Sequence, residues 1–470
     1  MTGEGYSSYP ILDALQKQLP GRHRFHVPAH CVLPYQYWSR YDLTELPGLD
    51  HLYHPQGCIA AAQELAAAVF RAEKTFFLVN GSSAGLMAAI LAFCRPGETL
   101  LVGRNSHRSV AAGLILSGAR PEFIPVAEGP AGIPLNITIA DAAHALNCSA
   151  TARGLLVTSP NYWGVSSDLV ALNALLRQRG MPLLVDEAHG GHFIFHEIFP
   201  GGAACSGATL WVNSGHKTLG ALTPGAYLHV RENIPELRKL EEALSMLQTA
   251  SPPYPVLLSL DLARGWLEKF GHSAFDAALE TAFRLRRAIN ESHVFQCLEQ
   301  HDLPHDLQLD PLRLTIYWNK FPLSGYRLSE LLHERGIEVE MAGPAYLVAL
   351  VHPGLTADAA TALLRALQDM EQRFGTGSPN HLPEPYPLPA LKLSPREAAT
   401  ANTRMVPLRE AAGLIAAQLV TPFPPGVPVL YPGEIILSET IARFEADLKA
   451  GVHFQDLTLK PRPLLSVVAE

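Results

Sequence analysis

The chain has 470 residues and a formal net charge of −8 at pH 7, from 36 Lys and Arg against 44 Asp and Glu. Apolar residues make up 48% of it and charged residues 17%, a composition that excludes a mostly disordered chain. The acidic balance gives no general attraction for a phosphate backbone or an anionic membrane surface. We therefore expect neither nucleic acid nor a membrane as a partner.

The apolar runs and the cysteines exclude two further classes of protein. Even the apolar segment 86–94 is too short to span a membrane. The amino terminus lacks a basic segment followed by an apolar stretch and a cleavage site, so we expect no secretory signal and a cytoplasmic location. The six cysteines form no CxxC pair, which predicts reduced thiols rather than disulfides or a thiolate zinc site.

From residue 56 to 230, short apolar runs alternate with helical patterns. The predicted helices include 59–72 and 167–180, the second with Gly180 as its C-cap. The predicted strands carry apolar residues without a break, which is typical of strands covered on both faces. They are 75–80, 99–103, 121–126, 154–160, 181–189 and 209–214. This alternation predicts an α/β fold with a mostly parallel sheet and helices on both faces.

The rest of the chain predicts smaller units. Residues 232–291 are helical in pattern, and a small α+β unit follows with strands at 313–319 and 345–351 and helices at 325–335 and 356–373. The proline-rich segment 376–389 predicts an extended connector. After it we expect a helix over 394–419, a rigid extended stretch at 422–434 and an amphipathic helix at 437–451.

Lys217 is the first residue that points to chemistry. It follows the predicted strand 209–214 in the segment WVNSGHKTLGALTPG, among small and apolar residues. A charged amine is costly there unless it is paired or used covalently. A desolvated lysine has a lowered pKa and can form a Schiff base, whereas a structural ion pair is the alternative interpretation.

Other polar residues follow other strands, and ligands gather at the carboxyl ends of strands in such sheets. Asp186 follows an apolar strand and can keep a pyridine nitrogen protonated. Ser82 and Ser83 follow Gly81 at a helix start, which suits a phosphate, although an ordinary N-cap is the alternative. His107 follows the strand 99–103, where its imidazole can lie flat on an aromatic ring. With Lys217, these residues describe a pyridoxal 5'-phosphate (PLP) site.

Over nearly the whole chain, ordered motifs resemble the Orn/Lys/Arg decarboxylases, a family of fold type I PLP enzymes. The matching segments are 25–30 (FHVPAH), 42–63, 76–85, 103–110, 186–192, 213–230, 393–398 and 422–434. The resemblance implies an amino-terminal arm (1–55), a PLP-binding large domain (56–295), a small α+β domain (296–375) and a linker with a C-terminal decarboxylase segment (376–470). The chain resembles the shorter members of the family, which lack a flavodoxin-like wing domain.

The resemblance also implies a role for each candidate residue. Lys217 would carry the cofactor as a Schiff base, Asp186 would pair with the pyridine nitrogen, and His107 would stack on the ring. The phosphate would be held by Ser82, Ser83, Ser214 and His216. Ala188 would pack beneath the ring and His189 would lie close to the cofactor. Glu434 would meet the distal cation of a basic substrate in the partner subunit's site.

The implied reaction is decarboxylation of arginine, lysine or ornithine to the corresponding amine, as in polyamine metabolism. Lys217 or His216 would return a proton to the substrate Cα. The implied assembly is a homodimer or larger homo-oligomer with shared active sites. Transamination, aldol cleavage, an atypical amino-acid substrate and a non-catalytic PLP-binding regulator remain alternatives.

Some positions depart from the family pattern, so the preferred substrate stays open. Ala29 and Cys31 stand where a glycine and a lysine are usual, Ala84 where a hydroxyl residue is common, and Pro224 where glutamine is frequent. A metal site at His189, His192 and His196 is a further alternative. Two glycines interrupt that segment and no cysteine lies near it, so we expect no metal.

Overall fold

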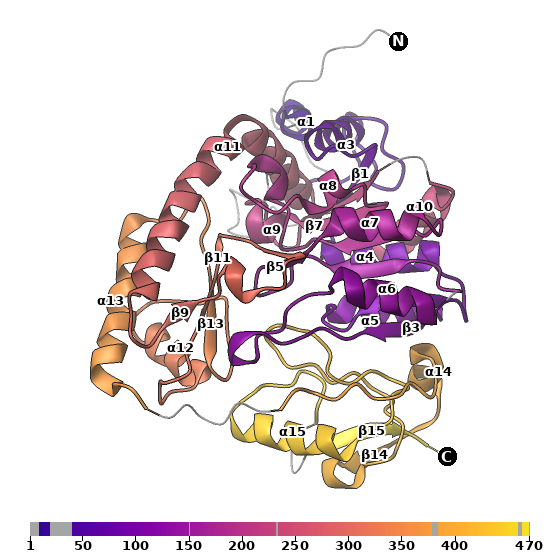
Figure 1. The fold of residues 1–470 in the computed structure, drawn as a ribbon. Helices are drawn as coiled ribbons and strands as arrows, with labels where there is room; N and C mark the ends of the chain where they lie inside the picture. The colour runs from indigo at the N-terminus through magenta and orange to yellow at the C-terminus, as the bar shows by residue number, and fades with distance from the viewer. Residues whose placement is uncertain are drawn as a thin grey trace.

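The computed structural model describes residues 9–18, 40–149, 151–231, 234–377, 384–458 and 463–469. The segment 25–30, with Ala29, and Cys31 lie outside these ranges, as does part of the predicted connector 376–389. Figure 1 shows a large sheet with its helices, a smaller sheet with two long helices along one side, and a C-terminal unit below both. Within the described ranges, no helix combines the length and apolarity needed to cross a membrane.

The large sheet has seven strands in the order β1-β8-β7-β6-β4-β2-β3. Their bounds are β1 (Lys74–Leu78), β2 (Thr99–Gly103), β3 (Arg120–Ile124), β4 (Leu155–Thr158), β6 (Leu183–Asp186), β7 (Leu210–Ser214) and β8 (Ala226–Val230). Strand β8 runs antiparallel to both of its neighbours, and every other adjacent pair is parallel. The mostly parallel sheet expected from the apolar runs is confirmed, whereas β8 was not among the predicted strands.

Both faces of this sheet are covered, as the unbroken apolar runs predicted. Leu184 packs in a core with α4, α5 and α10, whereas Leu183 and Val185 pack in a second core with α6, α7 and α8. Successive side chains of a strand point to opposite faces, so one strand feeds both cores. The helices are α3 (Cys58–Val69), α4 (Gly81–Phe93), α5 (Arg108–Ser117), α6 (Ile139–Cys148), α7 (Leu169–Arg177), α8 (Gly202–Ser206), α9 (Gly215–Thr218) and α10 (Leu237–Leu247).

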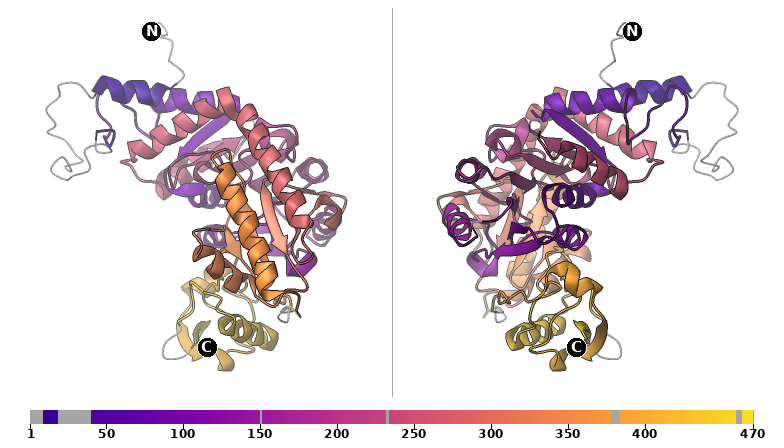
Figure 2. Two further views of the ribbon diagram at one scale, coloured as in Figure 1. Left: turned by 90° about the vertical axis from the view of Figure 1, so that its left-hand side faces the viewer. Right: turned by 90° about the vertical axis from the view of Figure 1, so that its right-hand side faces the viewer.

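The smaller sheet lies beside the long helix α11 (Tyr254–Asn290), as Figures 1 and 2 show. Its four antiparallel strands run in the order β12-β13-β11-β9. The elements of this region are β9 (Gln296–Cys297), β11 (Arg313–Tyr317), α12 (Gly325–His333), β12 (Met341–Ala342), β13 (Tyr346–Leu350) and α13 (Ala357–Phe374). The predicted strands and helices of the small α+β unit are therefore present. A short strand pair, β5 (Val165–Ser167) with β10 (Leu307–Leu309), links the two sheets.

The C-terminal unit has its own apolar core and one prediction for it was wrong. The segment 394–419 is not one helix: α14 (Pro395–Thr400) ends early, and β14 (Thr403–Pro407) pairs with β15 (Leu464–Val468). Beyond it, the N–H groups of Ala416 and Ala417 donate to the carbonyls of Glu434 and Ser466. Helix propensity is a weak preference, and these long-range pairings override it. The predicted helix 437–451 is confirmed as α15 (Ser438–Lys449).

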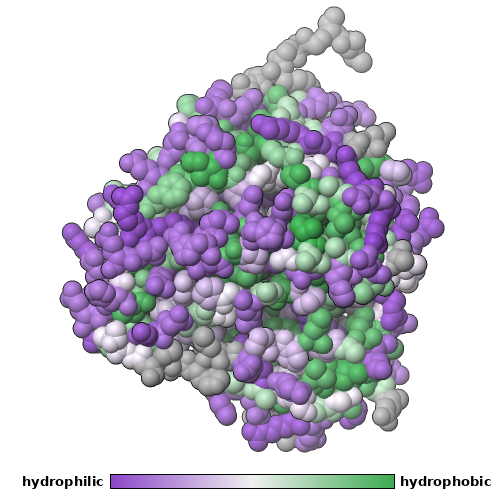
Figure 3. Space-filling model, in the orientation of Figure 1, coloured by the Kyte–Doolittle hydropathy of each residue, from purple (hydrophilic) through white to green (hydrophobic). Residues whose placement is uncertain are grey.

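The remaining elements are short. They are α1 (Pro10–Gln18) and the 3-10 helices η1 (Pro130–Gly132), η2 (Phe193–Phe195), η3 (Gln300–Asp302) and η4 (Leu408–Glu410). On the face shown in Figure 3, hydrophilic residues predominate over α13 and much of α11, and apolar side chains form scattered patches elsewhere. Scattered exposed apolar residues, such as Val170 of α7, are ordinary on a folded surface.

Candidate active site

Strands β6 and β7 bring the two central ionisable residues to one edge of the large sheet. The strands are adjacent and parallel, with Asp186 paired in register with Val212. Asp186 is the last residue of β6, and Ser214 is the last residue of β7. Helix α9 begins directly after β7 and carries Lys217 on its single turn. Two residues that lie far apart in the sequence therefore share one site because parallel strands end together.

The Lys217 amine lies in a mostly buried, aromatic environment. Its Nζ atom is 2.9 Å from Nε2 of His189 and 5.5 Å from the centre of the Tyr162 ring. Burial lowers the pKa of Lys217 because it disfavours the ammonium form, and the negative charge of Asp186 acts in the opposite sense. A lysine with these neighbours is suited to react as a nucleophile rather than to hold a surface ion pair.

Asp186 is a buried carboxylate that is short of cationic partners. It is 2% exposed, and its Oδ1 atom accepts a hydrogen bond from the Ala188 N–H at 3.1 Å. Burial raises the pKa of Asp186, while the charge of Lys217 and the Ala188 N–H lower it. A protonated pyridine nitrogen would supply the hydrogen-bonded cation that this carboxylate lacks.

An anion site is formed where β1 passes into α4. Gly81 opens the helix in the left-handed region, with φ of +76°, which favours glycine. Ser82 and Ser83 follow in the first turn, whose backbone N–H groups have no partner within the helix. The Ser214 hydroxyl donates to the Ser82 hydroxyl at 2.9 Å, so β7 meets α4 here. Pro224, one of the departures from the family pattern, lies beside Gly81, within 4 Å of where a Cβ would stand.

His107 and His216, two of the three histidines predicted at the cofactor, are held in fixed orientations. His107 caps α5, and its Nδ1 atom accepts from the Ser109 N–H at 3.3 Å. Burial, with the charges of Lys217 and Arg108, lowers the pKa of His107 to about 4, so the ring is neutral at pH 7. His216 donates from Nδ1 to the Gly225 carbonyl at 3.2 Å, and burial lowers its pKa as well.

The donor set as a whole fits PLP. Lys217 would supply the reactive amine, Asp186 the acid for the ring nitrogen, and His107 the neutral ring that can stack. Hydroxyls and free N–H groups meet at the start of α4 for the phosphate. Ala188, 4% exposed, and His189, 2% exposed, lie two and three residues after Asp186 on the loop after β6. Each role of these residues toward the cofactor stays a prediction.

The structure adds site residues that the sequence did not predict. Arg313 opens β11 and is 1% exposed, and its Nη2 atom donates to Nδ1 of His189 at 2.9 Å. The Tyr162 ring lies 4.5 Å from the His189 ring, and a Glu340 oxygen lies 3.9 Å from Nη1 of Arg313. An arginine opening an apolar strand was the signal available in the sequence. Which site it faces depended on the packing of the smaller sheet.

Glu434 is bound by an arginine of its own chain. Its side chain is fully buried within its own chain, so no atom of another subunit can touch it without a rearrangement. Its two oxygens accept from Nη1 and Nη2 of Arg104 at 2.5 and 3.0 Å, and one of them also accepts from the Tyr431 N–H at 2.8 Å. Within its own chain Arg104 therefore neutralises this carboxylate, and the role of Glu434 toward a substrate cation in the partner subunit's site stays a prediction.

The three histidines weighed as a metal site have separate partners. His189 contacts Lys217 and Arg313, Nε2 of His192 lies 3.3 Å from Asp310, and His196 lies 2.9 Å from Asp276. A different group, His196, Glu197 and His272, has potential ligand atoms within 4.8 Å of one another. The Nδ1 atom of His196 in that group already accepts from the Ile198 N–H.

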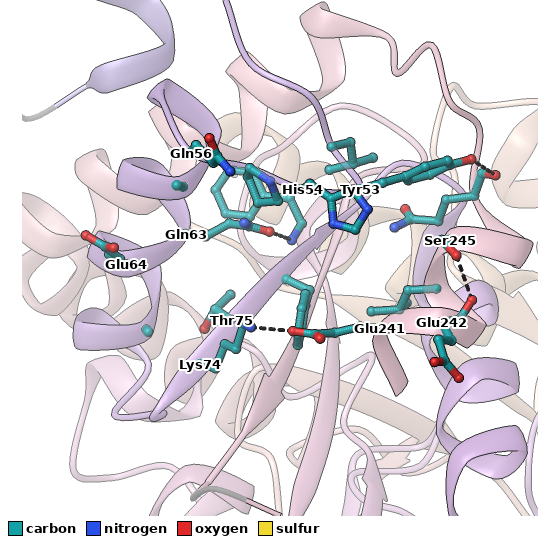
Figure 4. A pocket seen from close by; sticks show the side chains of 18 of the residues that line it. Tyr53, His54, Gln56, Gln63, Glu64, Lys74, Thr75, Glu241, Glu242 and Ser245 are labelled. Carbon is teal, nitrogen blue, oxygen red and sulfur yellow. Dashed lines mark hydrogen bonds and ion pairs between the residues drawn. The ribbon is translucent and has the colours of Figure 1, made fainter. Parts of the chain in front are cut away.

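A cavity of about 740 Å³ lies away from these residues, between α3, β1 and α10. Figure 4 shows its lining, with the Lys74 and Glu241 ion pair on one side and Tyr53 and His54 on the other. Among the described residues that line it, none is a predicted site residue. The candidate active site is therefore distinct from this cavity.

Comparison with known proteins agrees with the geometry. Residues 28–359 match the profile described as Orn/Lys/Arg decarboxylase, major domain, and residues 381–453 match the profile of the C-terminal domain of that family. The chain is 37% identical over 424 residues to an arginine decarboxylase of Bacillus subtilis, covering 88% of this chain and 86% of that one. It is 36% identical over 432 residues to an arginine decarboxylase of Bacillus anthracis, covering 89% and 87%.

The fold is also that of a solved decarboxylase. A lysine decarboxylase of Francisella novicida superposes with a TM-score of 0.87 at 19% identity, covering 99% of this chain and 81% of that one. At that identity the likeness shows the fold alone, a fold type I architecture. The family assignment rests instead on the profile matches and on the Bacillus relatives, which cover most of both chains. The chain belongs to the Orn/Lys/Arg decarboxylase family.

Proposed function

We propose that the protein is a PLP-dependent decarboxylase of a basic amino acid, and that its substrate is arginine. The observation that carries the proposal is the pairing of a buried amine, Lys217, with a buried carboxylate, Asp186, at the ends of adjacent parallel strands. Membership of the family supports the reaction class. The Bacillus relatives named as arginine decarboxylases support arginine over lysine and ornithine.

Each residue of the site has a physical task in this reaction. When bound, PLP supplies an electron sink for the electron pair left on the substrate Cα. Asp186 holds the proton at the ring nitrogen, and its burial strengthens that charge-assisted hydrogen bond. The neutral His107 ring would stack on the cofactor ring, and Ser82 and Ser214, which are hydrogen-bonded to each other at the start of α4, would hold the phosphate.

The bond changes are a decarboxylation followed by protonation. The bond between Cα and the carboxylate carbon breaks, CO₂ leaves, and Cα takes a proton to give the amine product. Lys217 is the residue placed to move that proton through Nζ, and His216 is the other candidate.

The test is an assay of the purified, PLP-supplied protein with arginine, lysine and ornithine in turn, measuring CO₂, the amine and any keto acid. We expect equal amounts of CO₂ and amine from arginine, no keto acid, and no turnover in Lys217→Ala. Exposed Lys239→Ala is the matched control and should retain full turnover. Keto acid without CO₂ would replace decarboxylation with transamination, and turnover of lysine or ornithine in preference to arginine would overturn the substrate.

Cofactor attachment is tested on the same preparation. Borohydride reduction of the PLP-loaded protein should leave a stable pyridoxyl group on Lys217, located by peptide mass spectrometry. A label on another lysine, or none on a loaded sample, would contradict the role of Lys217. The expected homo-oligomer and cytoplasmic location remain predictions beside this proposal.

A further inference from the structure

His189 lies between two cationic side chains, and the hydrogen-bonding capacity of each fixes where its proton sits. The Arg313 guanidinium has only donors, so Nδ1 of His189 must be the acceptor of the 2.9 Å contact. A neutral imidazole has one N–H, which must then be on Nε2. Nε2 faces Nζ of Lys217 at 2.9 Å.

The state of Lys217 follows from this assignment. If Nε2 carries the proton, it donates, and Nζ of Lys217 must accept. Only the neutral amine has a lone pair with which to accept, because an ammonium group is a donor alone. Two cations donating to the same ring would require an imidazolate, a form not reached at physiological pH.

We propose that Arg313 is a positioning residue: it fixes His189 with its proton on Nε2, and that N–H holds Lys217 as a neutral amine before the cofactor is attached. The proposal rests on the proposed function in that Lys217 is taken as the residue that joins PLP. We call the hydrogen-bonded series Arg313, His189 and Lys217 the relay. The neutral amine is the form that attacks an aldehyde, so the relay keeps Lys217 in the form that can react with the cofactor.

The surrounding charges do not by themselves decide the state of Lys217. Asp186 and Glu340 favour the ammonium form, whereas burial and Arg313 favour the neutral amine. Burial and the positive charge of Arg313 keep the pKa of His189 well below its usual value, which agrees with a neutral ring. The groups that face this pair are Asp186 of β6, Tyr162 of the loop after β4, His107 before α5, His216 of α9, Arg313 of β11 and Glu340 beside β12.

The first experiment measures the amine directly in the cofactor-free full-length protein. Lys217 is acetylated with trace acetic anhydride at a series of pH values and quantified by mass spectrometry, with exposed Lys239 as the internal reference. We expect the Lys217 labelling midpoint to rise by about one unit or more in Arg313→Gln, since removal of a nearby cation and of the fixed tautomer both favour the ammonium. Arg264→Gln, at another fully buried arginine, is the control and should leave the midpoint unchanged.

The second experiment separates the relay from simple charge repulsion. In a His189→Leu background the effect of Arg313→Gln should be clearly smaller, because only the charge contribution remains. An equal shift in both backgrounds would overturn the relay. Thermal melts by circular dichroism show which variants fold. The tautomer of His189 can also be read directly in the wild-type protein.

That reading uses ¹⁵N-histidine-labelled, cofactor-free protein, with the His189 signals identified by their loss in His189→Leu. A protonated Nε2 and an unprotonated Nδ1 support the proposal, and a protonated Nδ1 or an imidazolium overturns it. Neither experiment needs substrate or turnover. If the protein is inactive but His189 has the expected tautomer, the proposed function is contradicted and the role of Arg313 is supported. If the protein is active but the tautomer differs, the proposed function is supported and the role of Arg313 is contradicted.

Discussion

At the scale of single residues, burial decides which charged groups of the site can change state. Burial shifts the pKa values of Asp186 and Lys217 in the directions that favour their neutral forms, and the charged form of each shifts the pKa of the other back toward its ordinary value. Coulombic coupling of this kind makes either group sensitive to the loss of its partner. The catalytic demand on Asp186 is to remain charged while a positive ring nitrogen is beside it.

Asp186→Asn tests that demand with nearly unchanged shape. The amide can still accept from the Ala188 N–H, so we expect the fold and much of the cofactor binding to survive. Turnover should fall by orders of magnitude, because a neutral amide cannot hold the ring proton as charge develops in the transition state. The measurement is kcat at saturating PLP and substrate. Asp168→Asn, which retains a capping oxygen for α7, is the control, and equal kcat in both variants would remove Asp186 from the mechanism.

At the scale of elements, the extended stretch 422–434 holds the loop that follows β2. Arg108 donates its backbone N–H to the Gly426 carbonyl at 3.0 Å, beside His107. Arg104 of the same loop binds Glu434 through two hydrogen bonds, and its guanidinium contacts both the Phe123 and Tyr431 rings, 4.6 and 4.7 Å from their centres. The C-terminal unit therefore positions the loop carrying His107 within its own chain.

Glu434→Gln should for this reason act on stability rather than on selectivity. Loss of a buried charge-assisted pair costs about 1.5 to 3 kcal/mol, measurable as a lower free energy of unfolding in urea. The ratio of kcat/KM values for arginine, lysine and ornithine should stay as in wild type. The double variant Arg104→Gln/Glu434→Gln should lose less than the sum of the single losses. Altered selectivity at unchanged stability would instead support contact of Glu434 with the substrate.

At the scale of the whole molecule, buried neutral histidines set the acid limit of stability. His229 is fully buried in the large sheet, 5.0 Å from the Trp211 ring centre, with Nδ1 2.8 Å from the Thr75 hydroxyl. Burial lowers its pKa to about 3. Below about pH 6.5 the unfolded chain binds a proton that the folded chain does not, so the free energy of unfolding falls as the pH falls toward 3.

Between pH 7 and pH 5, His229 alone should cost about 2 kcal/mol of the free energy of unfolding. Buried Glu187 acts in the opposite sense: its pKa is raised to about 7, so its contribution weakens stability as the pH rises from about 4.5 to 7. Urea unfolding at several pH values measures how far the free energy of unfolding falls between pH 7 and pH 5. In His229→Phe this fall should be smaller than in the wild-type protein by about 2 kcal/mol. His333→Asn, at a side chain that is 71% exposed, should leave the pH dependence unchanged, and an unchanged slope in His229→Phe would contradict the account.

The sequence was sufficient to predict the strands of the large sheet other than β8, and the residues that gather at their carboxyl ends. Unbroken apolar runs predicted β2, β4, β6 and β7 because strands covered on both faces need apolar side chains throughout. Once those strands are parallel, their carboxyl ends meet, so Asp186, Ser214 and Lys217 had to lie together. Local pattern and strand direction were sufficient for this part of the site.

The contact of Arg313 with His189 beside Lys217, and that of Arg104 with Glu434, could be found only in the tertiary structure. Arg313 reaches His189 across 124 positions of sequence, and Arg104 reaches Glu434 across 330. The Ala-rich segment after Thr400 forms no long helix, because its backbone pairs with Glu434 and with β15 instead. Contacts at such separations depend on how elements that are distant in the sequence pack against each other. The periodicity within one segment carries no information about that packing.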